Sequence, residues 1–105
     1  MSENVPSAPS LGAELESLYA VLEQRKRDMP EDSYTVKLLE GPEDKLLKKI
    51  AEESGEVIIA ACQHDLGQLR YELGDLFYHM LVVMLRNGIE PADIAAELAS
   101  RHVEK

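Results

Sequence analysis

The sequence is short of basic residues and of long apolar runs. Only 11 of its 105 residues are Lys or Arg, against 20 Asp or Glu, and the formal net charge is -9. A surface with this balance repels the phosphates of nucleic acids and anionic membrane faces, so we expect neither as a partner. The apolar runs are also too short to cross a bilayer, which argues against a membrane protein.

Cysteine is nearly absent, because Cys62 is the only one in the chain. A single thiol excludes an internal disulfide and a cysteine-rich zinc site, and it fits a protein of the reducing cytoplasm. Residues 1–10 contain prolines but no charged segment followed by an apolar one. We therefore expect a disordered tail there and no signal peptide.

The alternation of apolar and polar residues that is typical of strands is missing too, and helical spacing takes its place. Apolar residues three and four positions apart predict helices over 11–27, 42–63 and 66–86, and a short one from residue 91. Residues 31–41 can form a further short helix capped by Asp32 or Ser33. The prediction is an all-α fold of four to five helices, as a single domain over residues 11–105.

The predicted helix 66–86 is apolar nearly all round, so we expect it to be buried. Its polar residues form a narrow stripe of Glu72, Asp75 and His79. Buried carboxylates must be protonated, paired with cations or bound to metal. Two alternatives to a metal site are a core network of salt bridges and, for His79 alone, an ordinary hydrogen-bonded core histidine.

The predicted helix 42–63 is amphipathic. Its apolar face is predicted to hold Leu46, Leu47, Ile50, Val57, Ile58 and Ala61, opposite Lys45, Lys49, Glu52 and Glu56, with Glu53 at the border. The simplest alternative is a solvated face with ion pairs such as Lys48/Glu52 and Lys49/Glu53. Against it, Lys before Glu is the weaker order, and three lysines lie in the N-terminal half, where the helix dipole disfavours them.

A turn of about three residues at His64-Asp65 joins these two helices, so they must run antiparallel, side by side. The turn brings together five acids: Glu52, Glu53, Glu56, Glu72 and Asp75. Facing carboxylates repel one another unless divalent cations lie between them, and Mg²⁺ prefers oxygen ligands and completes its shell with substrate phosphates. On the same helix, Lys45, Lys48 and Lys49 suit phosphate contacts.

These residues carry a resemblance to a known family. The two strings are DKLLKKIAEESGEVIIAA (Asp44 to Ala61) and YELGDLFYHMLVVML (Tyr71 to Leu85). They resemble phosphoribosyl-ATP pyrophosphatase of histidine biosynthesis, within the all-α NTP pyrophosphatase superfamily that includes MazG and dUTPase-like enzymes. The superfamily pattern EExxE…ExxD is met by the five acids. Three further pieces indicate the histidine branch: Ser33-Tyr34-Thr35, Lys48-Lys49 and the string from Asp75 to His79.

The resemblance extends from about Leu11 to His102 and implies a Mg²⁺-dependent homodimer that hydrolyses phosphoribosyl-ATP to phosphoribosyl-AMP and pyrophosphate. All five acids would be metal ligands, and Glu53, Glu72 and Asp75 would be catalytic, Glu72 as a ligand or as the base. Substrate would be held by Lys48 and Lys49, together with Ser33, Tyr34 and Thr35. His79 would support the acidic stripe through a hydrogen bond.

Two details qualify this interpretation. Cys62 stands where the family often has a lysine, which bears on phosphate binding. A dimer is also favoured by the residues themselves, because helix 66–86 is apolar on more sides than the other helices of one chain can cover. The alternatives are a house-cleaning pyrophosphatase of canonical or damaged nucleotides, which shares the same chemistry, and a non-enzymatic dimeric helical module.

Overall fold

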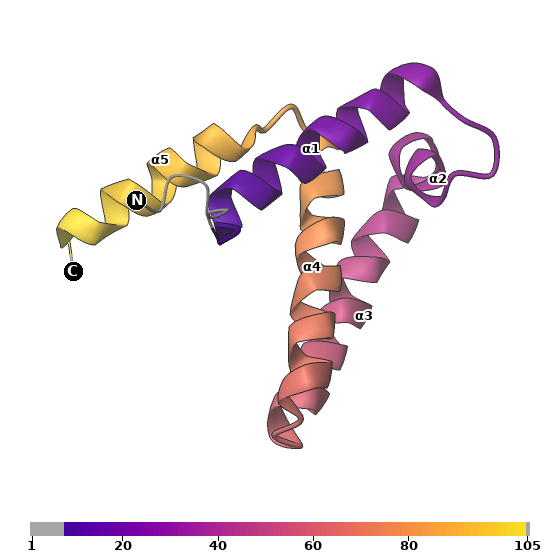
Figure 1. The fold of residues 1–105 in the computed structure, drawn as a ribbon. Coiled ribbons are helices and arrows are strands. Elements are labelled where there is room, and N and C mark those ends of the chain that lie inside the picture. The colour runs from indigo at the N-terminus through magenta and orange to yellow at the C-terminus, as the bar shows by residue number, and fades with distance from the viewer. Residues whose placement is uncertain (1–7, 105) are drawn as a thin grey trace.

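The computed structural model describes residues 8–104, and these contain helices and no strand. Its five helices are α1 (Leu11–Asp28), α2 (Tyr34–Glu40), α3 (Glu43–Cys62), α4 (Leu66–Arg86) and α5 (Pro91–Glu104) (Figure 1). The all-α prediction is confirmed. Of the predicted tail over 1–10, residues 1–7 lie outside the described part of the chain.

Local signals fix where the helices begin and end. The side chains of Ser10, Ser33 and Asp65 each accept a hydrogen bond from the backbone N–H three residues further on, at 3.1–3.2 Å. These bonds satisfy donors that the first turn of a helix leaves free. After α1, Met29 takes a left-handed conformation (φ 46°), and after α4 Gly88 does so at φ 69°. Both end their helices as left-handed residues commonly do.

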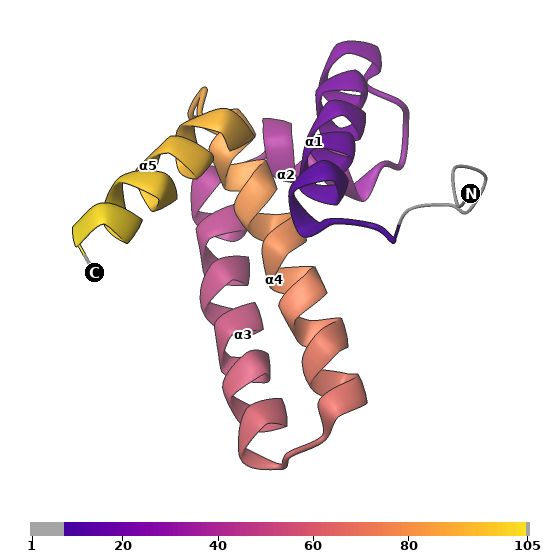
Figure 2. The same ribbon diagram turned by 60° about the vertical axis from the view of Figure 1, so that its left-hand side comes forward.

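The antiparallel hairpin of α3 and α4 is the centre of the molecule. The other helices meet only one end of it: α1 packs on α4, α2 lies between α1 and the hairpin, and α5 runs outward (Figures 1 and 2). The opposite end, with the turn at residues 63–65, projects away from them. The core therefore forms at the covered end, from Tyr19, Leu22, Leu38, Leu39, Leu46, Leu81, Val82 and Leu85.

Side-chain hydrogen bonds tie the smaller elements to this core. The Tyr19 hydroxyl donates to the main-chain oxygen of Ile89 at 2.8 Å, which holds α1 against the segment before α5. Arg86 donates through Nη1 to the carbonyl oxygens of Leu38 (2.9 Å) and Gly41 (2.8 Å). Because the last carbonyls of a helix lack internal partners, Arg86 completes the C-terminus of α2 and fixes the α2–α3 junction.

The predicted faces of α3 are partly wrong. Leu47 and Ile58, expected on its inner face, are 48% and 63% exposed, whereas Glu53, placed at the border, is 7% exposed. The buried residues of α3 are Leu46, Glu53 and Ala60, which are spaced by seven residues and so lie along one side of the helix. A helical wheel ranks faces by hydropathy, and it fails here because a carboxyl group occupies the seam between the helices.

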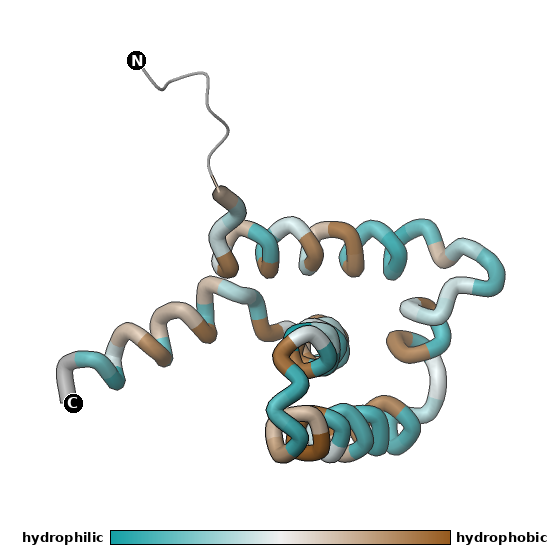
Figure 3. Tube along the Cα trace, turned by 60° about the horizontal axis from the view of Figure 1, so that its bottom comes forward, coloured by the Kyte–Doolittle hydropathy of each residue, from teal (hydrophilic) through white to brown (hydrophobic). Residues whose placement is uncertain are grey.

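Two further expectations need correction within one chain. Helix α4 is not buried all round, because Leu66 and Tyr71, near the projecting turn, are largely exposed. Helix α5 is longer than predicted, at 14 residues, and its Ile94 and Leu98 are exposed. Hydropathy colouring shows apolar positions along α5 and along the side of α1 that faces the rest of the molecule (Figure 3). No helix among the described residues has both the length and the apolarity needed to span a membrane.

Candidate active site

The geometry of the hairpin decides which acids face one another. Glu53 and Asp75 each lie 11 residues from His64, on opposite arms, and Glu56 and Glu72 each lie 8 residues from it. Residues equally far from a tight turn lie level with each other on antiparallel helices of equal rise. The turn therefore places Glu53 beside Asp75 and Glu56 at the level of Glu72.

Glu53 and Asp75 do meet, together with His79. One potential ligand atom from each of the three lies within 4.8 Å of the other two. Glu53 and His79 are buried, at 7% and 2% exposure, and Asp75 is half-buried. The cluster therefore has one open side, at the Asp75 carboxyl group.

The electrostatics of this cluster show an excess of negative charge. A hydrogen bond shared with the Asp75 carboxyl group, burial and the Asp75 charge together raise the pKa of Glu53 to about 7. Lys49 acts in the opposite direction, with its Nζ 3.7 Å from a Glu53 oxygen, and does not offset them. Without a cation, this carboxyl group tends to keep its proton.

Lys49 also pairs with Glu52, at 3.3 Å, so it bridges two of the acids. The predicted Lys49/Glu53 pair is therefore present. The predicted Lys48/Glu52 pair is not found among the described residues, because Glu52 has Lys49 as its partner. Lys45 and Lys48 are exposed.

The remaining acids differ in their surroundings. Glu72 is buried at 7% exposure, and its Oε2 accepts a hydrogen bond of 2.6 Å from Gln68 Nε2. Glu52 and Glu56 are exposed on α3. The structure thus brings two of the five predicted ligands into direct contact, holds Glu72 one turn away on α4, and leaves Glu52 and Glu56 on the solvent side.

The triplet Ser33-Tyr34-Thr35, predicted to bind substrate, is engaged in internal hydrogen bonds. The Ser33 hydroxyl caps α2, the Tyr34 hydroxyl lies 2.8 Å from His79 Nε2, and Thr35 Oγ1 bonds the hydroxyl of Tyr78. The Tyr34 ring stacks on Tyr78, with centroids 6.2 Å apart and planes 19° from parallel, and remains 48% exposed. Tyr34 is therefore the residue of the triplet most open to a ligand.

Sequence reasoning missed Tyr78, which bonds Thr35, stacks on Tyr34 and lies edge-on to His79. The only available signal was its place beside His79 in the motif. Burial raises its pKa above that of a free tyrosine, so Tyr78 stays neutral and can hydrogen bond to Thr35.

The donor set fits a hard divalent cation better than a soft one. Its oxygens come from carboxylates, and the raised pKa of Glu53 marks a site that lacks positive charge. A bound cation would act against that shift, because it offsets the Asp75 charge and favours the ionised form of Glu53. His79, in contrast, has both ring nitrogens within 2.8 Å of other partners, the Tyr34 hydroxyl and the main-chain oxygen of Asp75.

Comparison with known proteins agrees with this geometry. Residues 15–102 match the family model described as phosphoribosyl-ATP pyrophosphohydrolase. The chain belongs to this family. The matched range contains α2, α3 and α4 complete, and with them all five acids and the Tyr34–His79 contact. The family predicted from the two sequence strings is thereby confirmed.

Among curated relatives, the phosphoribosyl-ATP pyrophosphatase of Pelotomaculum thermopropionicum is 45% identical over 91 residues, which cover 87% of this chain and 93% of that protein. The enzyme of the same name from Leptospira biflexa is 46% identical over 82 residues, or 78% of this chain and 89% of that protein. The histidine biosynthesis bifunctional protein HisIE of Deinococcus radiodurans is 43% identical over 96 residues, which cover 90% of this chain and 44% of that protein. The chain thus spans about nine tenths of these two single-function relatives and less than half of the bifunctional one.

Proposed function

We propose that this protein hydrolyses phosphoribosyl-ATP to phosphoribosyl-AMP and pyrophosphate in histidine biosynthesis, in the cytoplasm. The family and the names of its relatives support the substrate. The observation that carries the proposal is the Glu53–Asp75 pair, in which carboxyl groups from two helices meet in a mostly buried cluster that opens at Asp75. Such a pair suits cation-assisted cleavage of a phosphoric anhydride.

The proposed cofactor is Mg²⁺, held by Glu53 and Asp75 with further carboxylates from Glu52 and Glu56. When bound, the metal screens the anionic phosphates and lowers the pKa of a coordinated water. Glu56 supports this set because it lies level with Glu72 and one turn from Glu53. His79 contributes indirectly, through its hydrogen bond to the main chain at Asp75.

The residues of the chain are assigned complementary tasks. Glu72 is separate from the Glu53–Asp75 cluster, and its carboxylate is oriented by Gln68. We therefore assign Glu72 the role of general base, which accepts a proton from the attacking water. Lys45 and Lys48 are exposed cations on the helix that carries Glu53, where they suit contacts to the phosphates. The exposed part of Tyr34 suits contact with the adenine base.

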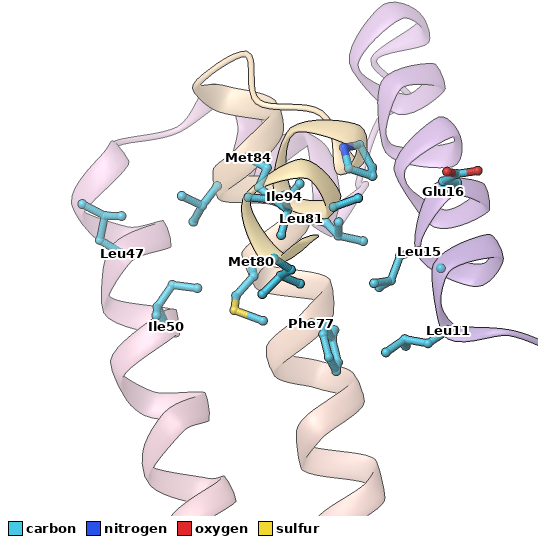
Figure 4. Close-up of a pocket in the computed structure, with 15 residues that line it drawn as sticks. Leu11, Leu15, Glu16, Leu47, Ile50, Phe77, Met80, Leu81, Met84 and Ile94 are labelled. Atoms are coloured by element: carbon cyan, nitrogen blue, oxygen red, sulfur yellow. The ribbon is translucent and has the colours of Figure 1, made fainter. Parts of the chain in front are cut away.

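The active unit is proposed to be a homodimer, because the chain leaves a broad apolar surface uncovered. A groove of about 670 Å³ lies between α1, α3, α4 and α5, lined almost entirely by apolar side chains (Figure 4). Leu47, Ile50, Phe77 and Met80 line it, and the same side of α3 and α4 continues toward the turn with exposed Ile58 and Leu73. A continuous stripe of this size favours a second copy of the chain.

The test is pyrophosphate release by the full chain with Mg²⁺, measured on phosphoribosyl-ATP and on a panel of canonical and oxidised nucleoside triphosphates. We expect the highest kcat/KM on phosphoribosyl-ATP. Preference for a nucleoside triphosphate would assign the same chemistry to a house-cleaning pyrophosphatase. Absence of any hydrolysis, with no heat of Mg²⁺ binding and no thermal stabilisation by Mg²⁺, would leave a structural helical module.

A further inference from the structure

Two side-chain hydrogen bonds join the start of helix α2 to helix α4. Tyr34 bonds His79, and its neighbour Thr35 bonds Tyr78, so two consecutive residues of one helix meet two consecutive residues of the other. The three rings pack together as well, with Tyr34 and Tyr78 both edge-on to His79 at centroid distances of 5.8 and 5.0 Å. Packing on two sides restricts rotation of the His79 ring.

The partners of His79 determine which ring nitrogen carries the proton. Its Nδ1 lies 2.8 Å from the main-chain oxygen of Asp75, which can only accept, so Nδ1 carries hydrogen. In a neutral ring Nε2 then has a free lone pair, and the Tyr34 hydroxyl, 2.8 Å away, donates to it. The ring is 2% exposed, so water does not compete for either position.

This arrangement extends from α2 to the acidic cluster. His79 Nδ1 lies 3.7 Å from the Asp75 carboxylate as well as 2.8 Å from its carbonyl, so the His79 ring adjoins both groups of that residue. The order of contacts is Tyr34 hydroxyl, His79 ring, Asp75. The resemblance assigned Tyr34 to substrate binding, but its hydroxyl is occupied by a contact within the protein.

We propose that Tyr34 is a positioning residue: its hydroxyl fixes the His79 ring in the orientation that directs Nδ1–H at the Asp75 carbonyl, and the fixed ring, beside the Asp75 carboxylate, limits where that carboxylate lies for the metal. Thr35 supports the same contact by fixing Tyr78 behind it. This inference rests on the proposed function, in which Asp75 binds Mg²⁺. It separates two roles of Tyr34, because the hydroxyl orients the site while the exposed part of the residue remains available to substrate.

The experiment compares Tyr34→Phe with Tyr19→Phe. Both remove one tyrosine hydroxyl with a 2.8 Å hydrogen bond inside the protein, but the bond of Tyr19 is to Ile89 and touches none of the site residues. The metal-free proteins are examined by nitrogen-15 NMR of the histidine rings, which distinguishes the two neutral tautomers. The chain has three histidines, and His79 is identified by the signal that His79→Asn removes.

We expect wild type and Tyr19→Phe to show His79 with hydrogen on Nδ1, and Tyr34→Phe to shift that signal. Calorimetry should show Mg²⁺ affinity lowered about tenfold in Tyr34→Phe and unchanged in Tyr19→Phe, as is typical when an outer partner of a metal ligand is lost. At saturating Mg²⁺, kcat should fall while KM changes little. Thr35→Val should lower Mg²⁺ affinity and kcat in the same direction, but less than Tyr34→Phe.

Three results would overturn the inference. They are hydrogen on Nε2 in the wild type, an unchanged His79 signal in Tyr34→Phe, and a raised KM with unchanged Mg²⁺ affinity, which would make the hydroxyl a substrate contact. Failure of the proposed function is distinct, because a wild-type protein without Mg²⁺ binding or hydrolysis would still report the His79 tautomer. Circular dichroism of each variant separates a local change from unfolding.

Discussion

The two ends of the α3–α4 hairpin differ in what covers them. At the end that meets α1 and α2, Leu46 and Val82 are 1% and 0% exposed, and hydrogen bonds from Tyr34 and Arg86 join α2 to α4. At the end with the turn, Leu66 and Tyr71 are 66% and 68% exposed. One chain therefore builds a packed core around half of its central hairpin and leaves the other half as an uncovered helix pair.

The cluster of Glu53, Asp75 and His79 lies between the covered end and the uncovered end of the α3–α4 hairpin. Glu53 and Asp75 have the buried His79 on their covered side, and toward the turn they are followed by Glu56 and Glu72. The covered end supplies rigid support, and in the proposed function the uncovered end would offer surface to substrate and to a second copy of the chain. A site at this boundary combines fixed ligands with access, as metal-assisted hydrolysis requires.

The largest effect is expected from the acids at the boundary. Asp75→Asn and Glu53→Gln preserve size but remove one charge each, and stabilisation of phosphate charge by a metal is worth several kcal/mol. We expect kcat/KM for phosphoribosyl-ATP to fall by about 10³-fold or more in each. Glu43→Gln, an exposed acid at the start of α3, is the control and should retain activity. Wild-type rates of pyrophosphate release in either site variant would exclude this cluster.

The next effect concerns the uncovered surface. Leu73→Glu and Met80→Glu place a charge on the apolar stripe of α4, where a second copy would bury it without a partner. Burying an unpaired charge costs about 3 kcal/mol or more, so we expect the dissociation constant of the dimer to rise by about 100-fold or more. Light scattering coupled to size-exclusion chromatography measures the mass. Ala20→Glu, exposed on α1 and outside the groove, should stay dimeric; a wild type that is monomeric at all concentrations would refute the dimer.

The same comparison shows what the sequence could and could not predict. The bounds of α3 and α4 were predicted to within one residue, because Asp65 and Asn87-Gly88 act locally as a cap and a stop. The short turn predicted that acids of the two helices face one another, but not that Glu53 is the one that meets Asp75. The burial of Glu53 and the Tyr34–His79 bond were not predicted either, since they depend on which faces meet across helices far apart in sequence, and local periodicity does not carry that information.

A moderate effect is expected from pH in the metal-free protein. Since the pKa of Glu53 is about 7 when folded and ordinary when unfolded, the folded state binds more protons between these values. The contribution of Glu53 to the free energy of unfolding is therefore complete at low pH and is lost as the pH rises through about 7. Glu53→Gln should raise the Tm at pH 8 by several degrees and change it little at pH 4. Glu56→Gln, exposed on the same helix, should follow the wild-type profile; a Glu53→Gln profile parallel to wild type would contradict the assignment.

The smallest effect separates the two neighbouring lysines of α3. Lys48 is exposed and Lys49 bridges Glu52 and Glu53, so the same change to alanine should act through different steps. Lys48→Ala should raise KM about two- to fivefold, because one exposed contact between charges contributes only a small free energy. It should leave the Mg²⁺ affinity unchanged. Lys49→Ala should weaken Mg²⁺ binding at neutral pH, because Lys49 is the cation that lowers the pKa of Glu53 and its loss lets that carboxyl group keep its proton more firmly. Calorimetry at pH 6.5 and 8.5 distinguishes them, since the Lys49→Ala deficit should shrink at the higher pH, where proton competition for Glu53 ends. Equal KM effects with no metal dependence would instead place both lysines on the phosphates.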